Sequence, residues 1–76
     1  MYLIETKVVI LEEGKEPFAC EITFDFDEIV YFIPDTYEGK DVVFLKLKSG
    51  DTFLVNYKYE AFKKKLYDAT DGNKAL

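Results

Sequence analysis

The stretch FACEITFDF, residues 18–26, alternates apolar and polar side chains almost without error. The apolar positions share one parity: Phe18, Cys20, Ile22, Phe24 and Phe26. The polar-facing positions share the other: Ala19, Glu21, Thr23 and Asp25, continued by Asp27. Because successive side chains of a strand point to opposite faces, this period of two predicts a strand with one face in a core and one in water.

The flanking segments predict further strands. Residues 2–11 are rich in β-branched and aromatic types, and residues 28–33 form a shorter run of the same kind that Pro34 ends. Residues 34–41 predict a loop, because they contain Pro-Asp and a glycine. Residues 42–48 and 52–57 flank Ser49-Gly50-Asp51 and predict a β-hairpin.

After residue 57 the apolar period changes to that of a helix. Tyr59, Phe62, Leu66 and Ala69 are spaced by three, four and three residues, which places them on one helical stripe. Asn56 is the predicted N-cap and Gly72 the predicted stop. The expected fold class is therefore α+β and mainly β. We expect an antiparallel meander of about five strands, with a curl toward a barrel as an alternative, and one C-terminal helix packed on the sheet.

Length and composition favour one small domain, predicted to span residues 1–70 and to be followed by a flexible tail at 71–76. The chain has 76 residues, and 17% of them are aromatic, so large rings can build a compact core. Phe24, Phe26, Phe32, Phe53 and Phe62 fit core positions. A lone cysteine, Cys20, excludes an intramolecular disulfide and is predicted to be a small buried hydrophobe. We find neither a run of 18 apolar residues nor a signal pattern, and we expect a soluble cytoplasmic protein without membrane contact.

The charged residues exclude several kinds of site. The formal net charge is −5, and the sequence contains neither His nor Arg. Without His, and with Cys20 predicted to be buried, the common nucleophile–base arrangements cannot form, so we expect no enzymatic activity and no cofactor. Nucleic-acid affinity depends largely on basic side chains at phosphates, so direct nucleic-acid binding is not expected.

The acidic cluster at residues 25–28 is the most conspicuous polar feature. Asp25, Asp27 and Glu28 are oxygen ligands of the kind that hard cations prefer, but the longer ligand series of a calcium loop does not follow them. We interpret the cluster, together with Glu21, as a solvated strand face that can meet a partner. Tyr37 lies in the predicted loop and is expected to be exposed, as tyrosines at interfaces are. The candidate partner-binding surface is therefore Glu21, Asp25, Asp27, Glu28 and Tyr37.

These observations favour a small acidic protein-interaction module that regulates or accompanies a larger bacterial or phage protein, or that forms a homo-oligomer. One alternative is an inhibitor, encoded by a phage or a mobile element, that imitates DNA phosphates with its carboxylates. A second alternative is a small metal- or ligand-binding domain that uses carboxylates.

Ile33-Pro34-Asp35-Thr36, followed by the predicted hairpin and helix, resembles small bacterial flagellar regulatory proteins. In those proteins a Pro-Asp-Thr loop leads into a hairpin with a glycine turn and a terminal helix. The resemblance covers about half of the chain and transfers no functional residue. It implies a small regulatory or accessory module of bacterial or phage type.

Overall fold

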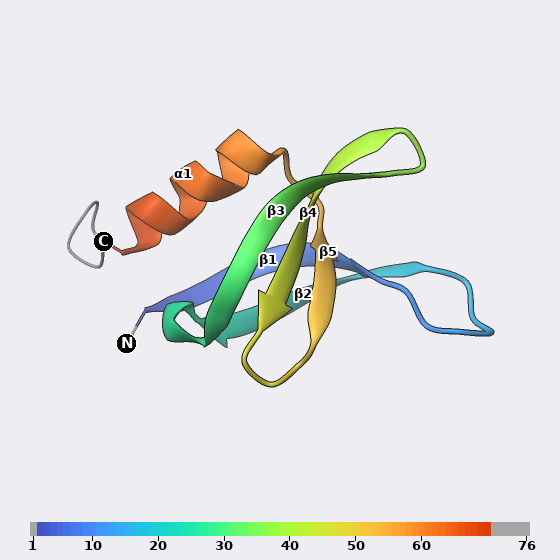
Figure 1. Ribbon diagram of the computed structural model, residues 1–76, viewed down its shortest axis with the longest axis horizontal. Coiled ribbons are helices and arrows are strands. Elements are labelled where there is room, and N and C mark those ends of the chain that lie inside the picture. Colours follow the sequence, from blue (N-terminus) through green and yellow to red (C-terminus); the bar gives the residue numbers. More distant parts are fainter. Residues whose placement is uncertain (1, 71–76) are drawn as a thin grey trace.

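The sheet of this protein contains five antiparallel strands in the order β2-β1-β5-β4-β3 (Figure 1). The computed structural model describes residues 2–70. The elements are β1 (Leu3–Ile10), β2 (Phe18–Asp25), the 3₁₀ turn η1 (Phe26–Glu28), β3 (Ile29–Tyr37), β4 (Lys40–Leu47), β5 (Thr52–Val55) and α1 (Tyr59–Ala69). The α+β prediction is confirmed, as is the hairpin around Ser49-Gly50-Asp51. The sheet does not close into a barrel, and β2 and β3 are its edges.

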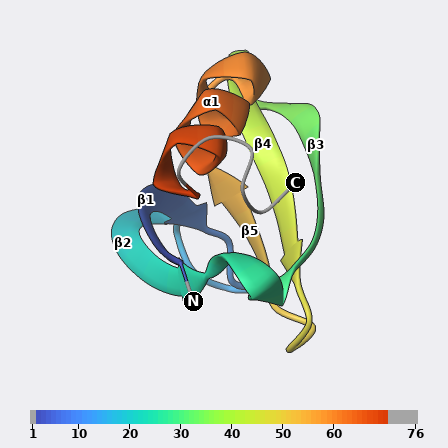
Figure 2. The ribbon, with the colours of Figure 1, turned by 90° about the vertical axis from the view of Figure 1, so that its left-hand side faces the viewer.

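Helix α1 packs on one face of the sheet, where the core lies (Figure 2). Phe62 is fully buried and Leu66 nearly so, and both meet the inward side chains of the strands. Those inward side chains are Ile4, Val8, Phe24, Val43, Leu45, Leu47 and Val55. Of the five predicted core phenylalanines, Phe24 and Phe62 are buried, while Phe26, Phe32 and Phe53 pack against the core from its margin. Cys20 is half-buried rather than buried, because its strand is an edge.

Strand β2 ends at Asp25, one residue earlier than its alternation predicts. The Asp25 carboxylate accepts a hydrogen bond from the Asp27 N–H at 3.0 Å and so caps η1. The chain therefore turns before Phe26, and the prediction that Asp27 continues the outer face of the strand is wrong. Asp27 is instead the middle residue of η1.

The prediction of a loop at residues 34–41 is wrong as well, because β3 continues through Pro34 to Tyr37. The turn contains only Glu38 and Gly39, both with positive φ. The Leu47 N–H donates to the Asp51 carbonyl, so odd-numbered residues of β4 direct their backbone groups toward β5 and even-numbered ones toward β3. Pro34 pairs with the odd-numbered Val43, so its missing N–H faces the free edge and costs no ladder bond.

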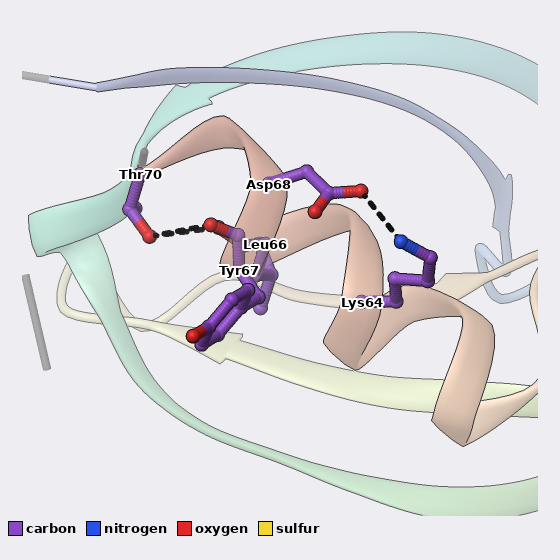
Figure 3. A network of polar contacts seen from close by, with 5 residues as sticks. All are labelled: Lys64, Leu66, Tyr67, Asp68 and Thr70. Carbon is purple, nitrogen blue, oxygen red and sulfur yellow. Dashed lines mark hydrogen bonds and ion pairs between the residues drawn. The ribbon is translucent and has the colours of Figure 1, made fainter. Parts of the chain in front are cut away.

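Helix α1 begins later than predicted, because Asn56 directly follows β5 and is hydrogen-bonded to β1. The Asn56 N–H donates to the Lys7 carbonyl at 3.0 Å, and Lys58 is the N-cap, without a capping side chain. Ala69, predicted on the apolar stripe, is exposed, and the helix end is closed by Thr70 instead. The buried Thr70 Oγ1 donates to the carbonyls of the preceding turn (Figure 3). The predicted stop at Gly72 and the predicted tail at 71–76 lie outside the described residues.

Candidate functional site

The face of the sheet opposite α1 carries one apolar residue from every strand in a single row. Ala19 pairs with Val9, and Val9 pairs with Leu54. Leu54 in turn pairs with Phe44, and Phe44 with Ile33. Because the sequence neighbours of these residues supply the core, the row itself points away from the helix. We call these five residues the apolar row.

The apolar row is accessible, most of all toward β3. Ile33 is 48% exposed and Tyr31, on the same face, is 44% exposed. The rings of Tyr31 and Phe44 stack at a centroid distance of 6.3 Å, so two aromatic side chains contact each other on this face. A shallow hollow of about 110 Å³ lies beside them and is lined by Val9, Leu11, Phe44, Thr52, Phe53 and Leu54.

Two of the predicted site residues lie on the open face of β2, and of these only Glu21 is next to the apolar row. Glu21 lies on the open face opposite Lys7, and Asp25 lies on the same face opposite Leu3. Both carboxylates therefore belong to the face that carries the row, at its β2 side. The same face also carries Glu5 and Lys7 of β1, so these two acids belong to a surface of mixed polarity beside the apolar row.

The other predicted site residues lie elsewhere. Asp27 and Glu28 are exposed in η1, close in sequence to Asp25 but outside the strand face. Tyr37 is half-buried rather than exposed, because it ends β3 in a pair with Lys40. The structure thus places Asp25, Asp27 and Glu28 where β2 ends, with Glu21 farther back along the strand and Tyr37 at the end of β3.

Tyr37 lines an open groove between the β1–β2 connection and the β3–β4 turn. The groove has a volume of about 460 Å³ and is lined by Val9, Glu16, Pro17, Phe18, Ala19, Tyr37, Glu38, Lys40, Val42 and Asn56. Its lining mixes acids, one lysine and apolar side chains without converging polar groups. It meets the apolar row at Val9 and Ala19.

Within residues 2–70, no three carboxylate or thiolate side chains come close enough together to hold a metal ion. No helix of the described chain is long and apolar enough to cross a membrane. The open face offers the aliphatic and aromatic area of the apolar row, with charged side chains of β1 and β2 beside it.

The apolar row was missed from the sequence, although part of its signal is visible there. In residues 42–48, Val43, Leu45 and Leu47 share one parity, and Phe44 shares the other with Lys46. Phe44 thus sits at a position where the strand should be polar. The row as a whole depends on which strands are neighbours, and no local pattern contains that information.

Comparison with known proteins finds no relative of this chain. No family model matches the sequence, and neither a curated protein nor a solved structure shows a significant match to it. The resemblance to small flagellar regulatory proteins stays a prediction, and its Pro-Asp-Thr segment lies within β3 rather than in a loop.

Proposed function

We propose that this protein is a non-enzymatic interaction module that regulates or accompanies a larger bacterial or phage protein by docking it on the open sheet face. The observation that carries the proposal is the apolar row, which crosses all five strands on the face that α1 does not cover. Contiguous exposed apolar surface on a soluble domain commonly marks an interaction site. The absence of His and Arg from the sequence supports a contact role rather than a catalytic one.

The aromatic pair supplies the expected anchor of this docking face. Tyr31 and Phe44 present stacked rings, and Ile33 lies beside Phe44 on β3. Large, rigid aromatic side chains dominate the binding energy of protein interfaces. The partner surface should therefore contain an apolar pocket or groove that accepts these two rings.

The acidic side chains of β2 indicate which charges the partner should carry around its apolar patch. Glu21 lies next to Ala19 of the apolar row on the same face of β2, Asp25 lies farther along that strand, and the whole chain carries a net charge of −5. A partner with basic residues around an apolar patch would complement these carboxylates. Rim charges act chiefly on the association rate, so binding should slow as salt is added.

Site-specific photo-cross-linking in a lysate of the source organism tests the proposal. A photoreactive phenylalanine analogue at position 33 should cross-link one protein, and the same analogue at the exposed position 63 of α1 should not. Introducing Tyr31→Ser into the position-33 variant should abolish the cross-link, because it removes one ring of the anchor. Equal cross-linking from both positions, or no effect of Tyr31→Ser, would count against docking on the open face.

Acidic mimicry of nucleic acid is the second candidate, favoured by the corner where β2 meets η1. Asp25, Asp27 and Glu28 lie there, with Glu21 four residues back along β2, and within residues 2–70 none of the four forms an ion pair with a lysine. This function predicts inhibition of a nucleic-acid enzyme that weakens with salt and with Asp27→Asn plus Glu28→Gln. Inhibition unchanged by both treatments would exclude it.

A further inference from the structure

The two edge strands of the sheet differ in how well they are protected against pairing with a strand of another chain. Edge strand β3 contains Pro34 and a bulge between Ile29 and Tyr31, both of which discourage pairing with another chain. Edge strand β2 has eight residues in regular register, with no proline, lysine or bulge. An edge of this length and regularity is a template for a further strand.

We infer that β2 is a self-association edge, which pairs antiparallel with β2 of a second copy and places Ile22 on the two-fold axis. This inference does not depend on docking at the apolar row. It names a second copy of this chain as the occupant, because the free backbone groups and the apolar side chains of β2 match their own two-fold image, and one register keeps its carboxylates from directly opposing one another.

The backbone groups that would pair are identified by the ladder between β1 and β2. The Phe26 N–H donates to the Tyr2 carbonyl at 2.7 Å, so even-numbered residues of β2 direct their backbone groups toward β1. The odd-numbered residues therefore direct theirs toward the free edge. Ala19, Glu21 and Thr23 present unpaired N–H and C=O groups there, at the spacing that an antiparallel neighbour needs.

The charges select one register. With Ile22 on the axis, Glu21 faces Thr23 of the second copy and Asp25 faces Ala19, so no carboxylate directly opposes another. A register centred on Glu21 would oppose the two Glu21 side chains, and one centred on Thr23 would oppose Glu21 to Asp25. Like charges directly across two strands destabilise the pairing. Registers centred farther out shorten the ladder.

The apolar face of β2 agrees with the same register. Cys20 and Ile22 are half-buried at the margin of the core. In the pair, Ile22 would face its own copy and Cys20 would face Phe24, so these side chains would be covered by apolar neighbours. The two Cys20 residues would lie four residues apart along the strands, about 13 Å, which is too far for a disulfide.

Cysteine cross-linking tests the inference in the full chain. In a Cys20→Ala background, Ile22→Cys should form a disulfide dimer under mild oxidation at least tenfold faster than Lys63→Cys, a control on the exposed face of α1. Residue 22 meets its own copy in a non-hydrogen-bonded pair, where Cα atoms are about 4.5 Å apart and a disulfide fits. The unmodified chain, with Cys20 alone, should cross-link no faster than that control. Equal rates for Ile22→Cys and Lys63→Cys would overturn the inference.

Charge variants at Thr23 test the register without touching the core. Thr23 is exposed. In the pair, Thr23 of each copy would face Glu21 of the other, so one substitution acts at two places. Thr23→Lys should tighten dimerisation by roughly three- to tenfold in sedimentation equilibrium, and Thr23→Asp should weaken it by a similar factor. A chain that stays monomeric at millimolar concentration, or variants that shift dimerisation in the same direction, would also overturn it.

Discussion

Two buried threonines show how one hydroxyl group stabilises or destabilises this small core. Thr6 lies on the inner face of β1, 2% exposed, and its Oγ1 finds no hydrogen-bond partner among the described residues. Thr70 is fully buried at the end of α1, and its Oγ1 lies 3.0 Å from the Leu66 carbonyl and 3.1 Å from the Tyr67 carbonyl (Figure 3). A buried hydroxyl without a partner retains its full desolvation cost, whereas a bonded one recovers it.

The same substitution should therefore have opposite effects at these two sites. Thr6→Val keeps the side-chain shape and removes the unpaired hydroxyl, and we expect the free energy of unfolding to rise by about 1 kcal/mol. Thr70→Val removes a bonded hydroxyl, and we expect a loss of about 1 kcal/mol. Urea denaturation followed by circular dichroism measures both changes, and each variant is the control of the other. A loss of stability in Thr6→Val would show that its hydroxyl is satisfied after all.

At the scale of elements, the tight turn between β3 and β4 carries backbone strain. Glu38 has φ of +50° and Gly39 has φ of +79°, the left-handed pair that a two-residue hairpin turn requires. Glycine adopts this conformation freely, but glutamate does not, and asparagine is the side chain that tolerates it best. We expect Glu38→Asn to raise the free energy of unfolding by about 0.5–1 kcal/mol, measured by thermal and urea denaturation.

Glu13→Asn is the matched control for the turn. Glu13 is exposed in the β1–β2 connection and does not have positive φ, so the same exchange should leave stability unchanged. An equal gain in both variants would assign the effect to the lost charge rather than to the turn.

The elements also show what local sequence patterns can and cannot predict. The alternation of residues 18–26 predicted β2 to within one residue, because an edge strand with one wet face keeps a clean period of two. Residues 34–41 were misread as a loop because Pro34 and Gly39 are turn formers in general. Pro34 is tolerated in β3 only because the strand is an edge and its nitrogen faces outward, which depends on the sheet and not on the segment.

At the scale of the whole molecule, strand order decides what is surface and what is core. The first strand, β1, lies inside the sheet between β2 and β5, so the apolar row assembles from residues that are far apart in the sequence. The acidic residues Glu21 and Asp25 were found from the sequence because they lie on a single strand. Val9 and Leu54 were not, because their shared face exists only once β1 and β5 are paired.

The single helix makes the stability of the whole domain depend on one side chain. Phe62 is fully buried, and its ring packs edge-on against Phe32 at 5.5 Å and stacks with Tyr57 at 6.4 Å. Removing a buried phenylalanine costs about 3–5 kcal/mol, and a domain of this size has a total stability of roughly 4–11 kcal/mol. We therefore expect Phe62→Ala to unfold much of the population at 37 °C, seen as lost thermal cooperativity in circular dichroism. Tyr67→Ala, at a helix position 45% exposed, should change stability by less than about 1 kcal/mol. If the two variants were equally stable, the packing of Phe62 on the sheet would not stabilise the fold, and the prediction would be wrong.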